Sequence, residues 1–395
     1  MKRSKAQRKR SQKETKPSAQ AKTWSQDLDT GVLISGMMLV SIGVVMNYST
    51  TAALALERQL PPLFISHIGA LLLGTCVAYM TYSMPLEFWR RLALPLWLVS
   101  VSLLAAVELA GVEVNGAQRW LGVPGLGIRF QPVEICKFTT VIMVAVLIAH
   151  RDGHEEVSLR RTISAGALAL PPIGLLLLQP DLGNAILLAT LVALLLIVAG
   201  TRLTRLIGPA IIGIAAVALY ISQNSYALRR ITGFIDPWAT YRAEGFQLVQ
   251  SFVAFGRGGV FGVGLGNGQQ KLAYLPEAHT DFILALVAEE LGLLGILVVL
   301  ASFAGLMLGG TRVARGKTDR FALLLTFGMT TLLTIPAVIN AAVVMGLLPT
   351  KGLTLPFLSY GRTSLIMNCA AFGLLLGLAR PEKPRSKEPG ARAWP

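Results

Sequence analysis

One carboxylate, Asp281, stands at the border between a long polar stretch and an apolar run that begins at Phe282. It directly follows His279 and Thr280, and Glu277 precedes them. A carboxylate at such a border can act as a general base; partial burial raises its pKa, whereas a nearby Arg or Lys lowers it. The alternative is that Asp281 only caps the helix that follows, as Asp and Thr commonly do.

A pair of ionisable residues, Glu134 and Lys137, opens another apolar run in Gln131-Pro-Val-Glu-Ile-Cys-Lys137. Residues three apart share a helix face, so the two side chains can reach each other or a common ligand. Ionisable side chains next to an apolar run are costly and usually face a protein interior or a cavity. The pair is therefore either part of a site or a structural ion pair.

Two further polar residues lie between apolar runs. Arg119 precedes Trp120, a combination that anchors helix ends at membrane interfaces, although a guanidinium is also well shaped to bind phosphate. Asp181, in Gln179-Pro-Asp181, joins two apolar runs with almost no loop. We expect it to cap the second of them.

A glycine-rich segment from Phe255 to Gly268 superficially matches a dinucleotide-binding loop. It has no βαβ context and no Gly-Lys-Ser/Thr follows, so we interpret the glycines as allowing close backbone packing or a re-entrant turn. Farther along, Glu289 and Glu290 are adjacent and cannot point the same way. We expect both to make structural hydrogen bonds.

The elements that must position these residues are membrane-spanning helices. Of 395 residues, 53% are hydrophobic and 14% are charged, which is too apolar for a soluble globular chain. Roughly 20 apolar residues cross a bilayer as a helix, and the runs here do not alternate as barrel strands do. The sequence thus predicts an all-α polytopic membrane protein. The bundle should contain about ten transmembrane helices, at Gly31–Tyr48, Leu63–Tyr82, Leu92–Ala110, Val133–Ala149, Ile163–Leu178, Leu182–Ala199, Leu206–Ile221, Phe282–Leu308, Phe321–Leu347 and Ser364–Ala379.

Basic residues fall in every second connection, which places those connections and both chain ends in the cytoplasm. The net charge of +15 is then a topology signal and does not indicate nucleic-acid binding. Residues 1–30 are expected to be a disordered basic tail, 31–380 the membrane domain and 381–395 a C-terminal tail. A long extracytoplasmic loop, residues 222–281, lies between spans seven and eight and should contain short amphipathic or re-entrant helices.

These motifs together resemble the SEDS (shape, elongation, division and sporulation) family of bacterial peptidoglycan glycosyltransferases, also called the RodA/FtsW family. The resemblance spans nearly the whole membrane region. Besides the motifs above it includes Leu275-Pro-Glu-Ala-His-Thr-Asp281, Glu289-Glu-Leu-Gly and Pro349-Thr-Lys-Gly-Leu-Thr-Leu-Pro356, the last of which favours the cell-division branch. Two positions depart from the family pattern: Val133 stands where Ser is usual, and Arg362 where Gly is usual.

The resemblance implies a reaction. Members of the family polymerise lipid II into glycan strands at the outer face of the cytoplasmic membrane. The lipid-linked MurNAc of the growing chain is the donor, and the GlcNAc 4-hydroxyl of lipid II is the acceptor. By motif match, Asp281 takes the place of the family's essential aspartate. Four residues match family positions implicated in substrate binding or cavity structure: Arg119, Glu134, Lys137 and Lys351. We add His279 as a substrate-binding candidate because it lies close to Asp281 in the sequence.

This chemistry sets its own demands. A carboxylate that takes the acceptor proton contributes typically about 10²–10⁴-fold. The leaving lipid pyrophosphate needs cationic residues or a divalent cation, Mg or Mn, and no organic cofactor. Because an α-linked donor gives a β bond, one inverting displacement suffices, with Asp281 as general base or metal-linked activator. The resemblance further implies a class B penicillin-binding protein, the FtsI-type transpeptidase, and other divisome proteins as partners, at the division septum.

Two other classes of function compete. A lipid II flippase would need essential ionisable residues near the middle of the membrane, whereas the candidates here cluster at one rim. A non-catalytic division scaffold would leave the chemistry to its partners. Cell division would then persist when Asp281 is replaced.

Overall fold

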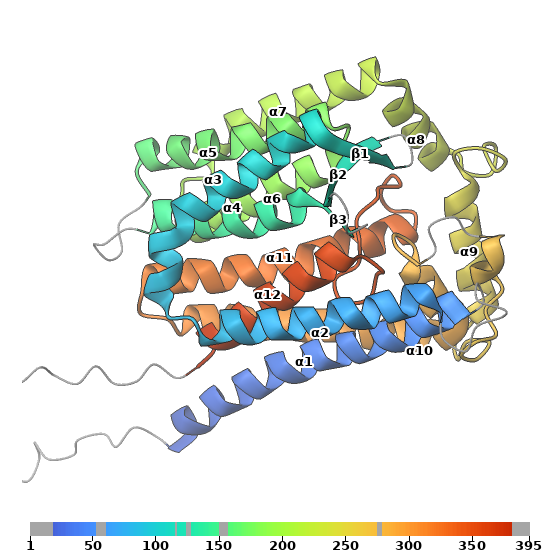
Figure 1. Ribbon diagram of the computed structural model, residues 1–395, viewed down its shortest axis with the longest axis horizontal. Coiled ribbons are helices and arrows are strands. Elements are labelled where there is room, and N and C mark those ends of the chain that lie inside the picture. Colours follow the sequence, from blue (N-terminus) through green and yellow to red (C-terminus); the bar gives the residue numbers. More distant parts are fainter. Residues whose placement is uncertain are drawn as a thin grey trace, which may run out of the picture.

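The expected spans are helical in the computed structural model, which describes residues 19–52, 61–114, 117–123, 128–149, 157–274 and 279–380. The helices lie side by side, and successive helices run in opposite directions between the left and right of Figure 1. Those that match the expected spans are α1 (Ala19–Ala52), α2 (Pro62–Ser83), α3 (Leu86–Ala110), α4 (Pro132–Ile148), α5 (Leu159–Leu178), α6 (Leu182–Val198), α7 (Thr204–Gln223), α10 (Ile283–Arg315), α11 (Arg320–Val344) and α12 (Arg362–Leu378).

Within the described residues, seven of these helices are long and apolar enough to cross a membrane. The other three, α4, α6 and α12, have 17 residues each, about 25 Å of helix. They lie inside the bundle, where neighbouring helices cover most of their side chains. The prediction of an all-α polytopic membrane protein is therefore confirmed.

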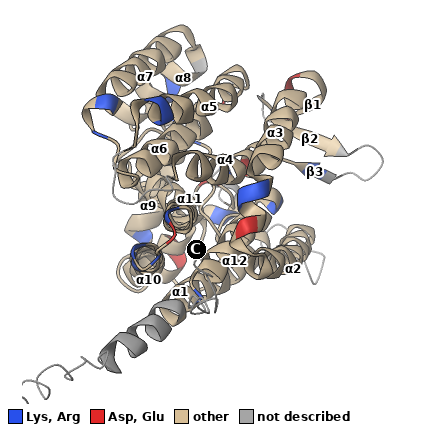
Figure 2. Ribbon diagram, turned by 90° about the vertical axis from the view of Figure 1, so that its left-hand side faces the viewer, with Lys and Arg blue, Asp and Glu red and all other residues tan. Residues whose placement is uncertain are grey.

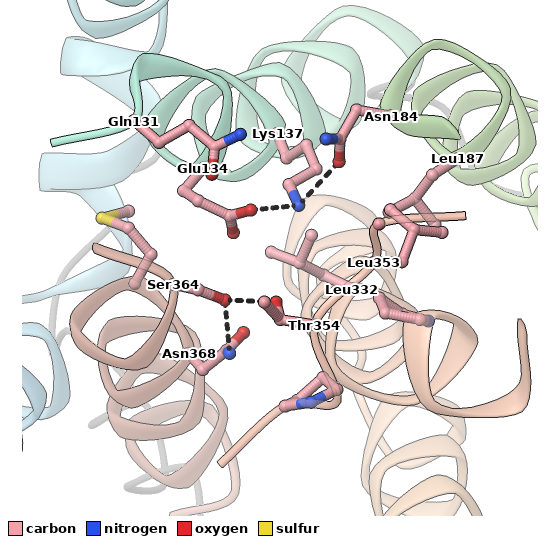
Figure 3. Close-up of a pocket in the computed structure, with 14 residues that line it drawn as sticks. Gln131, Glu134, Lys137, Asn184, Leu187, Leu332, Leu353, Thr354, Ser364 and Asn368 are labelled. Carbon is pink, nitrogen blue, oxygen red and sulfur yellow. Dashed lines mark hydrogen bonds and ion pairs between the residues drawn. The ribbon is translucent and has the colours of Figure 1, made fainter. Parts of the chain in front are cut away.

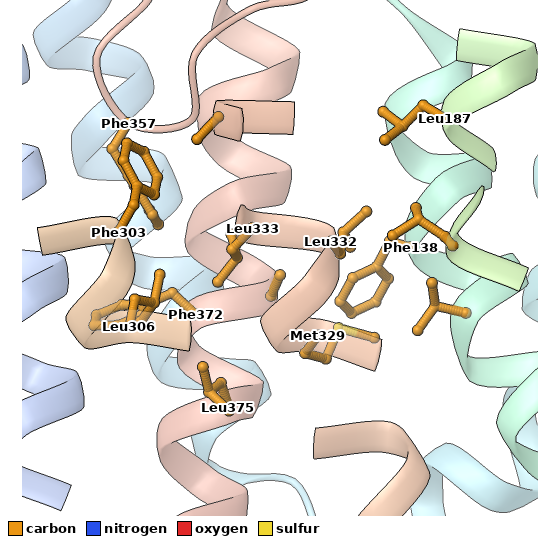
Figure 4. Packing of buried hydrophobic residues seen from close by; sticks show 14 of the residues in the cluster. Phe138, Leu187, Phe303, Leu306, Met329, Leu332, Leu333, Phe357, Phe372 and Leu375 are labelled. Carbon is orange, nitrogen blue, oxygen red and sulfur yellow. The ribbon is translucent and has the colours of Figure 1, made fainter. Parts of the chain in front are cut away.

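The core is centred on α11. Of its most apolar window, 72% is buried, whereas no residue of α7 is buried. Figure 4 shows Phe138 of α4 and Leu187 of α6 on one side of Leu332, and Phe303 and Phe372 on the other. α11 thus joins the α4–α6 side of the bundle to the α10–α12 side.

The candidate functional residues lie at one end of the bundle. There α3, α5, α7 and α11 end and α4, α6, α10 and α12 begin, on the right in Figure 1. We call it the site end. Seen along the helices in Figure 2, the ribbon is mostly uncharged, with sparse Lys, Arg, Asp and Glu, as expected where helices contact lipid.

At the site end, the connection after α3 is a small antiparallel sheet, which the sequence did not predict. Its strands, in the order β1-β2-β3, are β1 (Gly111–Val114), β2 (Ala117–Val123) and β3 (Ile128–Phe130). A bulge between Val112 and Glu113 shifts the β1–β2 register. The sheet delivers the chain from the end of α3 to the start of α4.

The long loop before α10 contains α8 (Ser225–Ile235), α9 (Phe246–Gly258) and the short π-helix η1 (Gln270–Tyr274). The loop therefore contains short helices, as we expected. At the other end of the chain, α1 begins at Ala19, so helix extends into the expected tail. The rest of that tail, residues 1–18, and the C-terminal tail from 381 lie outside the described residues.

The glycine-rich segment packs against a break in α10. Gly292 has a φ of 68° inside that helix, which frees backbone groups on both sides. The N–H groups of Val263 and Gly264 donate to the carbonyls of Glu289 (3.0 Å) and Glu290 (3.1 Å). A Cβ at Gly262 would lie 2.1 Å from the Glu290 carbonyl oxygen. The glycines therefore serve close backbone packing, as predicted.

Candidate active site

The Glu134–Lys137 pair lies on the first turns of α4, at the site end. Pro132 fits the first helical turn because it has no N–H to leave unsatisfied. Lys137 Nζ donates to Glu134 Oε1 at 2.8 Å and to Asn184 Oδ1 of α6 at 3.2 Å (Figure 3). Both side chains of the ion pair are less than a tenth exposed. The pair is thus enclosed, and it joins α4 to α6.

Asp181 extends this chain of contacts and caps α6, as predicted. Its Oδ1 accepts from the Asn184 N–H at 3.3 Å, and its Oδ2 accepts from Asn184 Nδ2 at 2.8 Å. Arg119 Nε lies 4.0 Å from Asp181 Oδ2. A continuous series of polar contacts therefore runs from Glu134 through Lys137, Asn184 and Asp181 to Arg119.

Arg119, on β2, donates hydrogen bonds to the tight turn between α5 and α6. Its Nε donates to the Gln179 carbonyl at 3.2 Å, and its Nη2 donates to the Pro180 carbonyl. The side chain is 27% exposed. Arg119 accordingly holds the turn that presents Asp181, in addition to lending the site its charge.

Lys351 lies in the connection between α11 and α12, close to α6 and α8. Burial lowers the pKa of its ammonium, as does the charge of Arg230 on α8, whereas Asp181 partly offsets both. Arg230 is held in place because its Nη1 donates to the Thr350 carbonyl at 2.9 Å. The charges of Arg230 and Asp181 thus both act on Lys351, which places a cation and a carboxylate near its ammonium.

Asp281 directly precedes α10, but it is not the residue that caps it. The cap position is Phe282, whose side chain makes no capping hydrogen bond, so Asp281 does not occupy the cap position. Asn340 Nδ2 donates to the carbonyls of Asp281 and Leu353, both at 2.8 Å. A Cβ at Gly352 would lie 3.2 Å from Asp281 Oδ2. The carboxylate thus lies against the Lys351–Leu353 segment.

His279 and Thr280 are fastened to the loop before α12. The Tyr360 N–H donates to the His279 carbonyl at 2.8 Å, and the two rings lie 5.7 Å apart between centroids. Ser359 Oγ donates to the Thr280 carbonyl and accepts from the Leu355 N–H. These bonds hold the segment that carries Asp281. Glu277 lies outside the described residues.

A small polar cavity lies beside the Glu134–Lys137 pair, and Asp281, Arg119, Lys351 and His279 are not among the residues that line it. Its walls come from α4, α6, α11, α12 and the Gly352–Thr354 segment, and they include Glu134, Lys137 and Asn184 (Figure 3). The volume is about 30 Å³, enough for water but far below the roughly 300–1,000 Å³ of small-molecule sites. A sugar can enter only if the walls move apart.

Glu289 and Glu290 make the expected structural hydrogen bonds, but the prediction that adjacent residues cannot point the same way is wrong. A Cβ at Gly268 would lie 2.9 Å from both Glu289 Oε2 and Glu290 Oε1, so both carboxylates reach the same segment. Glu289 accepts from the Gln269 and Gln270 N–H groups and pairs with Arg257 at 3.2 Å. Glu290 pairs with Lys271 at 2.7 Å. Both carboxylates are buried, and they fasten the start of η1 and the residue before it to α10.

The described residues also allow a test of metal binding. They include no group of three or more His, Cys, Asp and Glu side chains placed to hold an ion. Mg²⁺ commonly uses one or two carboxylates together with substrate phosphates. A single carboxylate such as that of Asp281 fits a shared site of this kind.

Sequence reasoning missed three residues of the site: Asn184, Asn340 and Arg230. Asn184 follows Asp181 by three positions and so shares its helix face. Asn340 is an amide within a long apolar run, where polar side chains are costly and usually have partners. Both signals could have been used, whereas nothing local links Arg230 to Thr350.

Fold and site together define a multi-pass helical membrane protein whose ionisable side chains converge at one end of its bundle. The sequence pattern of the FtsW/RodA/SpoVE family, described as cell cycle proteins, matches residues 30–384. The chain belongs to this family.

Proteins with similar sequences align with most of this chain. A probable peptidoglycan glycosyltransferase FtsW of Trichlorobacter lovleyi is 39% identical over 370 residues, 89% of this chain and 93% of that protein. One of Coxiella burnetii is 38% identical over 367 residues, 90% of this chain and 97% of that protein.

Among solved structures, a chain of a peptidoglycan synthase complex has a TM-score of 0.73 and 27% identity, covering 88% of this chain and 96% of its own. Thermus thermophilus rod shape determining protein RodA has a TM-score of 0.65 and 28% identity, covering 88% and 95%. Fold and family thus agree.

Proposed function

We propose that this chain is a peptidoglycan glycosyltransferase that polymerises lipid II into glycan strands during septal wall synthesis. The names of its relatives support the reaction. The observation that carries the proposal is the convergence of Asp281, the Lys351–Arg230 cation pair and the Glu134–Arg119 polar series at one end of an apolar bundle. In the bacterial inner membrane, with both chain termini cytoplasmic, this end faces outward, where the lipid-linked sugars lie.

Asp281 acts as the general base in this proposal. The acceptor 4-hydroxyl attacks C1 of the donor sugar from the face opposite the diphosphate, and its proton passes to the Asp281 carboxylate. The C1–oxygen bond to the diphosphate breaks, and the configuration inverts from α to β. Asn340 holds the Asp281 backbone at 2.8 Å, so the carboxylate is positioned before the substrates arrive.

The departing lipid diphosphate is assigned to Lys351 and Arg230. Charge that develops on a leaving group is stabilised best by cations already fixed nearby. Lys137 is less available, because Glu134 and Asn184 already accept from its ammonium. Glu134 and Lys137 are therefore assigned to the cavity wall and to sugar hydroxyls, and His279 to the substrate beside Asp281. A Mg²⁺ or Mn²⁺ ion shared between Asp281 and the diphosphate would add Lewis-acid stabilisation.

The decisive experiment is polymerisation of labelled lipid II by the purified chain, with and without chelator. Asp281→Asn should abolish glycan strands while its thermal unfolding and lipid II binding stay near wild type. Asp236→Asn is the matched control, because Asp236 is an exposed carboxylate at the same end. Normal strand length from Asp281→Asn would refute the catalytic assignment. Transfer of lipid II across vesicles without polymer would favour a flippase.

A cognate class B penicillin-binding protein is the proposed partner, with other divisome proteins. Support comes from the similar chain that was solved within a peptidoglycan synthase complex. Adding the purified transpeptidase to the polymerisation assay should raise the yield of strands from the wild-type chain and leave Asp281→Asn inactive. Restored polymerisation by that variant would instead indicate a scaffold.

A further inference from the structure

A second opening lies on the side of the bundle where α2, α4 and α12 meet. It is a groove of about 430 Å³ with mostly apolar walls, lined by residues such as Gly69, Leu73 and Ile366. At the site end it is bordered by two cations, Arg129 of β3 and Arg362 at the start of α12. An apolar groove bordered by two guanidinium groups fits an amphiphile with an anionic head.

The two arginines are not used by the fold. Neither guanidinium makes a hydrogen bond or an ion pair with any described residue, and Arg129 is exposed while Arg362 is partly buried. This differs from Arg119 and Arg230, which donate to backbone carbonyls. A guanidinium fork matches phosphate oxygens in geometry as well as in charge.

The groove also shares a wall with the polar cavity. Thr363 lines the groove, the next residue Ser364 lines the cavity, and Met367 lines both. Thr363 Oγ1 accepts from the Gln131 N–H at 3.2 Å, which ties the start of α12 to the start of α4. A head group held by Arg129 and Arg362 would therefore lie next to the candidate active site.

We propose that this groove holds the hydrocarbon chain of a lipid diphosphate and that Arg129 and Arg362 bind its diphosphate. The inference rests on the proposed function, which makes lipid diphosphates the substrates. Polymerisation joins two lipid-linked molecules, so two diphosphates must be held at once. The Lys351–Arg230 pair accounts for one of them, and the groove supplies a site for the other. Arg362, which replaces the usual Gly, then makes head-group binding in this chain stronger than in its relatives.

The occupant follows from charge complementarity. A protein helix could fill the apolar walls but would give the two guanidiniums no anion, and a neutral lipid would do no better. A membrane phospholipid carries one phosphate, whereas a lipid diphosphate offers each arginine its own group of oxygens. The groove should therefore bind a lipid diphosphate more tightly than a phospholipid, whereas arginines that only anchor the protein at the membrane surface would not distinguish the two.

Native mass spectrometry of the full chain in detergent can count and rank bound lipids. The probe is a long-chain polyprenyl diphosphate, compared with the matching monophosphate and with phosphatidylglycerol. Arg129→Gln and Arg362→Gln should each weaken binding of one diphosphate molecule about tenfold, the loss expected for one charged hydrogen bond. Arg362→Lys should lose less. Arg242→Gln, an exposed arginine elsewhere at the site end, should change nothing.

Gly69 allows the groove to be blocked without disturbing the fold. A Cβ at Gly69 would meet no atom within 4 Å, and Leu favours helix over Gly. Gly69→Leu should therefore fold normally and lose one bound diphosphate. Gly166→Leu on α5 is the matched control, because its Cβ would also meet nothing within 4 Å and it lies outside the groove.

Two outcomes would overturn the groove site. One is unchanged diphosphate binding by Arg129→Gln, Arg362→Gln and Gly69→Leu. The other is equal affinity for phosphatidylglycerol, which would reduce the arginines to membrane anchors. Because binding is measured without turnover, these results are independent of whether Asp281→Asn still makes polymer. Failure of the groove and failure of the proposed reaction are thus distinguishable.

Discussion

Lys137 is an enclosed cation with two acceptors, Glu134 at 2.8 Å and Asn184 at 3.2 Å. Removing one partner of a buried ion pair costs about 3–5 kcal/mol, because the other charge stays buried and unpaired. Lys137→Met should therefore lower the free energy of unfolding by about that much. Thermal unfolding in detergent measures the loss.

The double variant Glu134→Gln/Lys137→Met provides the control for this prediction. Replacing both charges removes the pair without leaving one charge exposed to apolar surroundings, so most of the lost stability should return. A double variant as unstable as the sum of the two single variants would show that the contact is not what stabilises the pair.

Lys351 should make diphosphate binding depend on pH. Burial and the charge of Arg230 lower the pKa of its ammonium below the ordinary value of 10.5. Diphosphate favours the charged ammonium, so affinity should fall as pH rises through the lowered pKa. Folding stability should move the other way and rise with pH up to 10.5, because the unfolded chain binds more protons in that window.

Titration of diphosphate binding against pH tests this directly. Lys351→Arg should flatten the profile, since arginine stays charged throughout the range. Arg230→Gln should shift the fall in affinity to higher pH by removing a cause of the lowered pKa. An unchanged profile in both variants would assign the pH dependence to another group.

Residues close in sequence were the predictable part of the site. Helix periodicity placed Glu134 beside Lys137, and turn chemistry placed Asp181 at its cap. Periodicity cannot reach across elements, so the bonds from Asn340 to Asp281 and from Arg230 to Thr350 needed the structure. Each joins parts of the chain that are far apart in sequence.

The break in α10 is the element most sensitive to substitution. Gly292 has a φ of 68°, and a Cβ there would lie 2.3 Å from the Gly262 nitrogen. Gly292→Ala should therefore lower the free energy of unfolding by about 1–3 kcal/mol. Gly166→Ala, in a regular helix with open space around it, should stabilise the chain by up to about 1 kcal/mol. Equal thermal shifts for both variants would contradict a strained break.

Element positions were predictable to different degrees. Apolar run length located the helices, but it ended the run of α10 at Leu308, whereas the helix continues to Arg315. Once outside lipid, a helix no longer needs apolar residues to persist. Strands β1 and β3 were not predicted because they have 4 and 3 residues, too few for an alternating pattern to stand out. Strand β2 has 7 residues, but they do not alternate between apolar and polar.

The orientation of the whole molecule can be tested with single cysteines in a background without Cys76, Cys136 and Cys369. Arg242→Cys lies at the site end and Arg315→Cys at the opposite end. A membrane-impermeant maleimide added to intact cells freed of their outer layers should label position 242, and label position 315 only after lysis. The reverse pattern would place the site in the cytoplasm and remove it from the proposed reaction.

The lack of buried residues in α7 has a consequence for the membrane around the protein. α7 has 20 residues, about 30 Å of helix. Leu206 packs against the core and Arg205 donates to the Val157 carbonyl near its start, but most of its length faces outward, so the thickness of the bilayer influences its tilt. α8 follows directly and carries Arg230 to Lys351 and Thr350. Lipids with longer or shorter acyl chains should therefore shift the cation pair and change the polymerisation rate. The polymerisation rate of the chain would then depend on the thickness of the surrounding membrane.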